Sequence, residues 1–581
     1  MDRARAILDF PGATAHPERL RFDAPRHVIT AETVAAVRPA LRAADEAARA
    51  GHWVVGFLSY EAAPAFDPAH AVRPPDGPTP LAWFGVFGPP LTGAEPAAAD
   101  VTPLDWQADT PRNRYDDAIR AIRDAIAAGV VYQVNYTLRL RARCTLDPLV
   151  WYDALVARAH GRYHALIQTP RWCVLSASPE LFLDLRDRRV TTRPMKGTAR
   201  RGRWLEEDSA ACDRLAASAK DRAENLMIVD LVRNDLGRVA RFGSVAVPSL
   251  FDIERYPTLL QMTSTVTAEL RDDVALDDLF AATFPCGSIT GAPKFTALRA
   301  IAQLEDAPRG LYCGAIGVLR PDRSATFNVA IRTIVIDSAT ATASYGVGGG
   351  ITWDSDAHAE YDETLAKSAL LHDHTPSFRL LETLRLEHGS CLRLERHLRR
   401  LAESAEYWNF CRTVVPRARA ALEREAARAP GGAWRIRLLA SADGTVEVQR
   451  TPLEPQDVRR VYDVALARTA VSAHEPLLHH KTTARATYDA RRADHPDLDD
   501  VLLYNEEGLI TEFCNGNAVV ELDGALLTPP RSCGLLAGTF RAELLERATI
   551  REHPITLLDV RRAARIWLIN SVREWVPCRL L

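Results

Sequence analysis

The chain has 581 residues, of which 47% are hydrophobic and 25% charged, with a formal net charge of −3. Because this length exceeds that of a single hydrophobic core, two or three domains are expected. The small net charge provides no positive potential to attract nucleic acid. No stretch approaches the roughly 20 apolar residues that span a bilayer, and the N-terminus lacks the apolar core of a signal peptide. Ten cysteines without a C-x-x-C pair argue against a zinc site or a disulfide framework, so we expect a cytoplasmic protein.

The pattern along the chain changes once in a way that indicates a domain boundary. Residues 1–88 alternate short apolar runs with Pro-rich breaks, which predicts strands and turns, and residues 89–103 have the composition of a loop. Isoleucines at helical spacing predict a helix at residues 115–129 that stops at a glycine. The polar, Pro-containing residues 372–378 form the best candidate linker. We therefore predict a first domain at 1–371 and a second at 379–581.

Two predicted helices of the first domain carry carboxylates on an inward face. Glu224 lies in a helix predicted for residues 220–239, one turn before Ile228, so that it shares a mostly buried face. A second helix, predicted for residues 358–371, places Glu360, Glu363 and Lys367 on one face. Inward carboxylates from two helices suit Mg²⁺, although solvated helix faces also carry glutamates at these spacings.

Other segments of the first domain indicate an anionic ligand. The glycine-bearing residues 284–294 and 345–355 leave backbone amides accessible, and Arg332 lies in a strand predicted for residues 328–336. Neither glycine stretch is a P-loop or a dinucleotide fingerprint, so the ligand is not expected to be a nucleotide. Lys196 lies in a tight bend between basic flanks, which is either a solvated surface loop or a lysine with a chemical role.

Seven motifs in chain order resemble the chorismate-utilising enzymes, a family that includes anthranilate, isochorismate and aminodeoxychorismate synthases. They are "YQVNYT", "SASPELF", "RPMKGT", "RAENLMIVDLVRND", "FPCGSITGAPK", "AIRT" and "GVGGGITWDS…EYDETLAK", and they lie between about residues 50 and 370. Lysine in the Pro-Met-Lys-Gly-Thr bend is similar to the aminodeoxychorismate synthases, whereas anthranilate synthases have alanine there.

The resemblance implies a role for each matched residue. Lys196 would attack C2 of chorismate and expel the C4 hydroxyl, Glu180 would protonate that hydroxyl, and ammonia would then enter at C4. Gln133 stands where water-activating members have a lysine, which fits ammonia as the incoming group. Asn225 departs from the usual histidine, so the hydrogen bond of that histidine is in question. The implied Mg²⁺ ligands are Glu224, Glu360 and Glu363, and the implied substrate-binding residues are Gln133, Thr198, Tyr312, Arg332, Gly348, Gly349 and Lys367.

The second domain resembles the class IV fold of pyridoxal-phosphate enzymes, which includes transaminases and aminodeoxychorismate lyase. The similarity is in "RLERHLRRL", "LHHKTT", "NEEGLITEFCNGN" and "LLTPP". Lys481 would bind the cofactor covalently and move protons, Glu512 would pair with the pyridine nitrogen, and Thr383 would assist catalysis. The implied phosphate-binding residues are Arg400, Gly538, Thr539 and Ser571. The usual opening strand of this fold is missing or truncated, so reduced activity of this half is an open alternative.

Together these features predict an α+β chain, with a β-sandwich-type chorismate-binding domain followed by a class IV α/β domain. The expected activity is two-step synthesis of 4-aminobenzoate for folate, and the enzymatic alternative is an anthranilate-type synthase joined to an amino acid transaminase. A metabolite-binding regulator is the non-enzymatic alternative. No glutaminase Gly-x-Cys-x-Gly elbow occurs in the sequence, so ammonia from a separate glutamine amidotransferase subunit is expected. A homodimer through the second domain is an open expectation of the resemblance, with no nucleic-acid or membrane partner.

Overall fold

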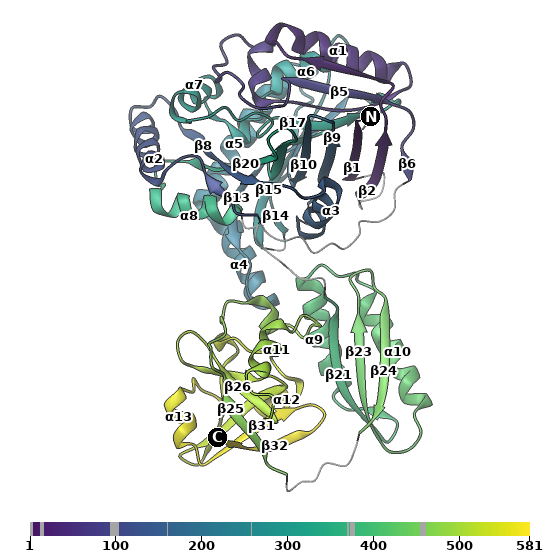
Figure 1. Cartoon of the computed structure of the whole chain (residues 1–581), viewed down its shortest axis with the longest axis vertical. Helices are drawn as coiled ribbons and strands as arrows, with labels where there is room; N and C mark the ends of the chain where they lie inside the picture. The colour runs from purple at the N-terminus through teal and green to yellow at the C-terminus, as the bar shows by residue number, and fades with distance from the viewer. Residues whose placement is uncertain are drawn as a thin grey trace. The chain divides into compact units, whose positions relative to one another are not determined.

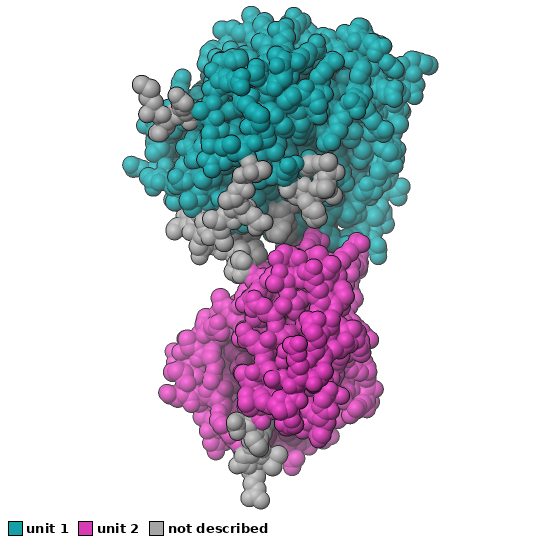
Figure 2. Space-filling model, turned by 90° about the vertical axis from the view of Figure 1, so that its right-hand side faces the viewer, with its two compact units in different colours: residues 1–200, 212–375 teal, residues 201–211, 376–581 magenta. Residues whose placement is uncertain are grey.

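The computed structural model describes residues 4–11, 17–92, 104–159, 161–256, 258–368, 371, 378–453 and 460–581. Its contacts divide the chain into two compact units (Figures 1 and 2). Unit 1 comprises residues 1–200 and 212–375, and unit 2 comprises residues 201–211 and 376–581. Most of the loop predicted at 89–103 and of the linker predicted at 372–378 lies outside the described residues. The assignment of residues 201–211 to unit 2 was not predicted.

Unit 1 is built on two antiparallel sheets, each with ten strands among the described residues. The first sheet contains β1 (Arg5–Pro11), β2 (Pro17–Asp23), β6 (Leu91–Thr92), β7 (Gln107–Ala108), β8 (Gln133–Arg143), β9 (Tyr163–Gln168), β10 (Trp172–Ser178), β16 (Gly291–Ala292), β19 (Thr333–Asp337) and β20 (Thr342–Ile351). The second contains β3 (His27–Ala31), β4 (Trp53–Leu58), β5 (Ala82–Phe87), β11 (Leu181–Arg186), β12 (Arg189–Arg193), β13 (Met195–Arg200), β14 (Ala246–Arg255), β15 (Leu259–Glu269), β17 (Ala315–Leu319) and β18 (Ala325–Val329).

A hydrophobic cluster shared by the two sheets explains why they pack face to face. Alternate residues of β1, including Leu8 and Phe10, join Phe57 of β4 and Trp172 of β10 in this cluster. The intervening Ile7 belongs to a second cluster that includes helix residues, because successive strand residues point to opposite faces. The α+β class and the sandwich-type architecture are therefore confirmed.

Helices cover the outer parts of unit 1, and the first of them lies where strands and turns were predicted. They are α1 (Val34–Arg49), α2 (Arg112–Ala127), α3 (Pro148–Ala159), α5 (Ala219–Gly237), α6 (Leu276–Thr283), α7 (Lys294–Leu304) and α8 (Ala357–Lys367), with α4 (Leu205–Ala217) beginning in the unit 2 segment. The prediction of strands and turns for residues 1–88 was wrong at α1, which packs on β3, β5 and α6 (Figure 1). Its core face consists mainly of alanines, with Val37 and Leu41, and Pro39 interrupts the helical pattern.

Unit 2 combines an open sheet with a closed ring of strands. The open sheet contains β21 (Leu380–Glu387), β22 (Ser390–Cys391), β23 (Ala433–Ala440) and β24 (Val446–Pro452), and α9 (Leu394–Tyr407) and α10 (Val414–Arg428) pack on it. The second sheet contains β25 (Tyr462–Leu466), β26 (Asp500–Tyr504), β27 (Ile510–Phe513), β28 (Gly516–Leu522), β29 (Ala525–Thr528), β30 (Arg551–Glu552), β31 (Arg565–Asn570) and β32 (Glu574–Leu580). Because β27 also pairs with β28, six of these strands close on themselves around a hydrophobic cluster. The remaining helices are α11 (Ala486–Ala493), α12 (Thr539–Glu546) and α13 (Leu557–Arg562).

The strand predicted across residues 328–336 is interrupted. β18 ends at Val329 in one sheet, β19 begins at Thr333 in the other, and Arg332 between them has φ of +50°. The prediction was wrong because the apolar run crosses from one sheet to the other, which requires a bend that the pattern does not encode. Separately, no helix within the described residues has both the length and the apolar composition needed to cross a bilayer.

Candidate active sites

A cavity of about 380 Å³ in unit 1 collects most of the residues predicted for the first domain. It is lined by strands β13 and β20, by helices α5 and α8, and by the loops around them. The predicted residues in its wall are Glu180, Lys196, Thr198, Glu224, Tyr312, Arg332, Gly348, Glu360, Glu363 and Lys367. Asn135, Lys220, Asp221, Gln261 and Ser288 also line it and were not predicted.

The backbone that carries Lys196 is held by side chains on both sides. The register between β13 and β15 shifts between Met195 and Thr198, and Gly197 adopts φ of +92°, so the strand bulges at this point. The buried Asn225 amide donates a hydrogen bond to the Lys196 carbonyl at 3.2 Å and accepts one from Ser264 at 2.5 Å. Asn225, the departure from histidine, therefore anchors the backbone of β13 at Lys196.

Burial favours the neutral form of both Lys196 and Glu180. Burial lowers the pKa of the Lys196 amine, and the neighbouring Lys367 lowers it further, against the opposing effect of nearby glutamates. Burial raises the pKa of the Glu180 carboxyl to about 7. The Ser288 hydroxyl donates to Glu180 at 2.5 Å and so favours the carboxylate. The cavity therefore contains an amine suited to nucleophilic attack and a carboxylic acid suited to proton donation.

Gln133 lies beside Lys196 behind the glycine strand β20. A methyl group at Gly350 would overlap the Gln133 side-chain nitrogen and lie 2.7 Å from the Lys196 amine nitrogen. The side-chain oxygen of Gln133, Oε1, is buried and has no hydrogen-bond partner among the described residues. Gly350, which was not predicted, is thus the position whose missing side chain leaves room for both groups. Of the two, Lys196 lines the cavity and Gln133 is outside its lining. Gly349 is outside the lining of the cavity.

Three carboxylates at one end of the cavity provide oxygen ligands for a cation. Burial raises the pKa values of Glu224 and Glu360, and negative neighbours raise both further. Lys367 instead lowers the pKa of Glu363, with which it pairs at 2.8 Å. Within the described ranges, no three His, Cys, Asp or Glu side chains already form a closed metal site. The donor set nevertheless fits Mg²⁺, because crowded carboxylates, of which Glu224 and Glu360 are half-buried, gain stability from a hard divalent cation.

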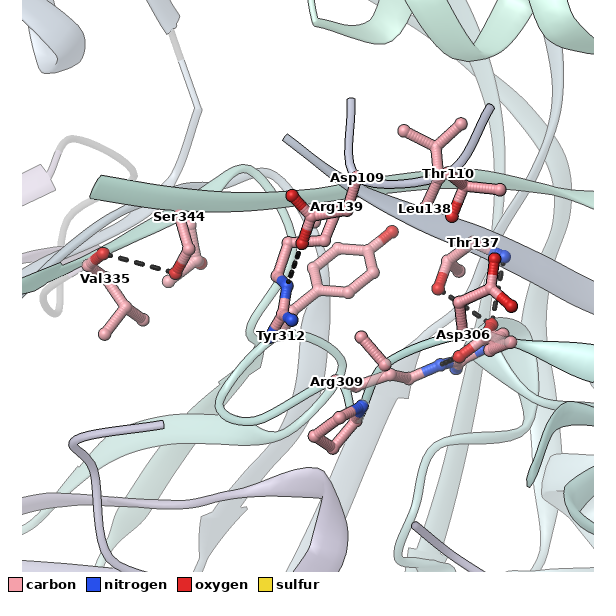
Figure 3. A pocket seen from close by; sticks show the side chains of 15 residues that line it. Asp109, Thr110, Thr137, Leu138, Arg139, Asp306, Arg309, Tyr312, Val335 and Ser344 are labelled. Atoms are coloured by element: carbon pink, nitrogen blue, oxygen red, sulfur yellow. Dashed lines mark hydrogen bonds and ion pairs between the residues drawn. The ribbon is translucent and has the colours of Figure 1, made fainter. Parts of the chain in front are cut away.

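Arg332 and Tyr312 also line the cavity. The left-handed backbone of Arg332 directs its guanidinium into the cavity, where it lies 5.8 Å from the ring centre of Tyr256. The Tyr312 ring packs on Gly346 and also borders a separate cavity of about 40 Å³ (Figure 3). Figure 3 shows this ring among side chains from several segments, including Thr137 and Arg139. Tyr312 therefore separates the larger cavity from the smaller one.

A cavity of about 490 Å³ in unit 2 collects the residues predicted for the second domain. The predicted residues in its wall are Thr383, Arg400, Lys481, Glu512, Gly538, Thr539 and Ser571. Burial lowers the pKa of the Lys481 amine to about 8, and Arg400 adds to the effect. The Lys481 carbonyl accepts a hydrogen bond at 2.8 Å from the Leu381 amide of β21. This lysine therefore has a fixed backbone and an amine that deprotonates readily.

The buried Glu512 carboxylate is oriented by three donors. The Tyr488 hydroxyl donates at 2.8 Å, the Leu536 amide at 3.1 Å and the Asn517 amide group at 3.2 Å. Burial raises the pKa of Glu512 to about 7, so the carboxyl shares a proton easily with a basic partner. Such a group fits the pyridine nitrogen of pyridoxal phosphate.

Arg400 is held by a glutamate that the sequence did not identify as functional. Glu382 accepts from Arg400 at 2.9 and 2.6 Å and from His397 at 2.6 Å. Burial alone would raise the pKa of Glu382, but the Arg400 charge outweighs it and holds the pKa at about 2. The pKa of His397 is lowered by burial, so its neutral ring donates to Glu382 and accepts from the Thr539 hydroxyl at 3.1 Å.

These contacts connect Arg400 to the first residue of α12. Gly538 caps that helix, and its amide donates to Asn517 at 3.1 Å. A guanidinium beside a helix N-terminus fits a phosphate group, which supports the predicted phosphate-binding residues. The Ser571 hydroxyl donates to the Thr383 carbonyl at 3.0 Å, so it is already engaged. The sequence feature that could have identified Glu382 is its position next to Thr383 in the "LLETLR" strand.

Two enzyme families match successive stretches of the chain. Residues 91–373 match the chorismate binding enzyme family, and residues 379–581 match amino-transferase class IV. The chain thus carries a chorismate binding enzyme domain followed by an amino-transferase class IV domain, as the sequence motifs predicted.

Individual relatives agree with the first assignment. Aminodeoxychorismate synthase component 1 of Escherichia coli is 41% identical over 263 residues, which is 45% of this chain and 58% of that protein. An anthranilate synthase component 1 of Haloarcula marismortui is 38% identical over 291 residues, or 50% of this chain and 59% of that protein. The chain thus spans less than two thirds of these relatives. The structure of anthranilate synthase component I from Streptococcus pneumoniae is 24% identical to this chain and has a TM-score of 0.52. The match covers 64% of this chain and 90% of that one. At this identity the similarity shows the fold alone.

Proposed function

We propose that the chain converts chorismate to 4-aminobenzoate in two reactions, one in each cavity. In the first, the Lys196 amine attacks C2 of chorismate, the ring double bonds shift, and the C4 hydroxyl leaves as water with the Glu180 proton. Ammonia then adds at C4 and expels the lysine, which gives 4-amino-4-deoxychorismate. The observation that carries this proposal is the shared cavity of a lysine with a lowered pKa and a glutamic acid with a pKa of about 7.

Mg²⁺ would be held by Glu224, Glu360 and Glu363, where it would neutralise a carboxylate of the substrate. Arg332 and Lys367 would bind further anionic oxygens, and Gln133 beside the lysine would face the incoming ammonia. The name "component 1" of the E. coli relative fits an ammonia supply from a separate glutamine amidotransferase.

The second cavity would remove pyruvate from the product of the first. Pyridoxal phosphate supplies an electron sink when bound, with Glu512 at its pyridine nitrogen and with Arg400, Gly538 and Thr539 at its phosphate. Lys481 would take the C4 proton of the substrate, and loss of the C3 side chain as pyruvate leaves the aromatic ring. Arg435 and Arg437 line the mouth of this cavity from β23, which suits a substrate with two carboxylates.

One incubation distinguishes the candidate functions. Purified chain, chorismate, Mg²⁺, ammonium and pyridoxal phosphate should yield 4-aminobenzoate and pyruvate in equal amounts. 2-Aminobenzoate would instead identify an anthranilate-type synthase. Accumulated 4-amino-4-deoxychorismate would identify an inactive or transaminating second unit, and the absence of turnover would favour a regulator.

The Lys196→Ala variant tests the covalent step. It should lose C4 amination while keeping the thermal unfolding profile of the wild type. Mass spectrometry of the wild type under turnover should find a chorismate-derived adduct on the peptide that contains Lys196. Full amination by the variant would refute the role of the lysine.

A further inference from the structure

Residues 201–211 belong to unit 2, although they lie in sequence between Lys196 and Glu224 of the first site. The buried Arg201 guanidinium pairs with the buried Asp208 carboxylate at 2.6 Å, and a side chain at Gly202 would collide with the Asp208 backbone. The Gly202 amide also donates to Asp208 at 3.1 Å. The segment is therefore folded into a compact turn before α4 begins.

This turn is bound on one side to the end of α9. Arg201 donates to the Tyr407 carbonyl at 2.9 Å, and its guanidinium lies 4.2 Å from the centre of the Tyr407 ring. The Tyr407 hydroxyl donates in return to the Gly202 carbonyl at 2.8 Å. Tyr407 is fully buried, so these contacts are part of the interior of unit 2.

On the other side the turn contacts the residues directly before Lys481. The Trp204 ring lies 5.0 Å from the His479 ring, and Arg203 donates to the carbonyls of Ala473 at 3.3 Å and Ser532 at 3.0 Å. The His480 ring stacks on Tyr407 at 4.4 Å.

Both histidines are buried, and burial lowers their pKa values to about 4 for His479 and about 3 for His480. They therefore remain neutral and serve as packing rings. The stretch that carries Lys481 is thus clamped between β21, which bonds the Lys481 carbonyl, and the 201–204 turn, which packs on His479.

We propose that Arg201–Trp204 are positioning residues of the second site, which hold the His479–His480 stretch and thereby direct the Lys481 amine into the cavity. This inference rests on the proposed cofactor role of Lys481, but not on whether the second reaction is an elimination or a transamination. It also implies that the second domain is incomplete when it is cut at the 372–378 linker.

The test compares full-length Trp204→Ala, Trp204→Phe and Trp567→Ala, each saturated with pyridoxal phosphate. Trp567 is a matched control, because it is also half-buried in unit 2 and packs edge-on against Trp575 at 5.7 Å, outside the cavity wall. The readouts are the pH midpoint of the bound cofactor's absorbance, the rate of pyruvate release from aminodeoxychorismate, and chorismate consumption.

Trp204→Ala should shift the absorbance midpoint and slow pyruvate release about tenfold or more, while chorismate consumption stays within about twofold. Trp204→Phe should restore both, because a phenyl ring can still pack on His479. If Trp204→Ala does not fold, Arg203→Met replaces it, since it keeps the Trp204 ring and removes the two carbonyl contacts together with the Glu207 ion pair and the cation contact to Trp204. An unchanged absorbance midpoint with a rate of pyruvate release within twofold of the wild type would overturn the inference. An equal loss of pyruvate release in Trp567→Ala would also overturn it. A wild type that binds no cofactor would instead refute the proposed function of unit 2.

Discussion

Replacing the buried Glu382 by glutamine should destabilise unit 2 and weaken pyridoxal phosphate binding together. The pKa of this carboxyl is held at about 2, against an ordinary value of about 4.3, and each pKa unit corresponds to about 1.4 kcal/mol. The ionised carboxylate thus contributes on the order of 3 kcal/mol to folding, which agrees with the range for breaking a buried ion pair. Glu382→Gln leaves the Arg400 charge uncompensated and the His397 donor with a weaker acceptor.

The assay is urea-induced unfolding of unit 2 in the full chain, at pH 7 and at pH 3.5. Unfolding is monitored by the absorbance of bound pyridoxal phosphate. Because the pKa of Glu382 is depressed on folding, its contribution is complete above about pH 4.5 and is lost as the pH falls toward 2. The difference between variant and wild type should therefore be about 3 kcal/mol at pH 7 and smaller at pH 3.5.

Glu387→Gln is the matched control on the same strand. Its partner Arg385 lies at 2.8 Å in a partly exposed pair, so its loss should change the unfolding free energy by no more than about 1 kcal/mol. Equal effects of the two substitutions, or a pH-independent difference, would refute the reasoning.

Three further substitutions test individual contacts. Ser288→Ala removes the donor that favours ionised Glu180, so the pKa of Glu180 should rise further and the alkaline limit of chorismate conversion should move to higher pH; an unchanged pH–rate profile would contradict this. Gly350→Ala places a methyl group 2.7 Å from the Lys196 amine and should reduce C4 amination about 100-fold in a coupled assay without altering cofactor absorbance. Arg437→Met should raise the KM for aminodeoxychorismate about tenfold at constant cofactor affinity, and an unchanged KM would exclude substrate contact.

The two helices that carry the carboxylates of the first cavity were predicted from the sequence. α5 begins and ends within two residues of the helix predicted for 220–239, whereas α8 ends at Lys367, before the predicted end at residue 371. The irregular backbone at Lys196 was also predictable, because Pro194 restricts its own φ and Gly197 permits the positive φ at the strand bulge. The prediction failed at α1 because Pro39 inside the helix suggests a break, although Val37, Leu41, Ala44 and Ala48 recur at helical spacing.

Residues that act through distant contacts could not be found in this way. Ser288 reaches Glu180 across 108 positions, and Asn225 reaches the Lys196 carbonyl across 29. Neither serine nor asparagine is distinctive until the fold brings its partner close. Arg332 illustrates the same limit in the backbone, because its left-handed bend exists only where the chain changes sheets.

Both cavities contain a lysine whose pKa is lowered, and the causes that lower it come in the same order. Burial is the largest cause of the lowered pKa at Lys196 and at Lys481, and a neighbouring cation, Lys367 or Arg400, is secondary. A buried amine is screened little by salt, whereas the contribution of a partly exposed cation decreases as ionic strength rises. The closure of each cavity around its lysine should therefore govern reactivity more than the charge of any single neighbour. This places residues such as Asn225 and Trp204, which shape the backbone around the amines, alongside the charged residues in determining the chemistry.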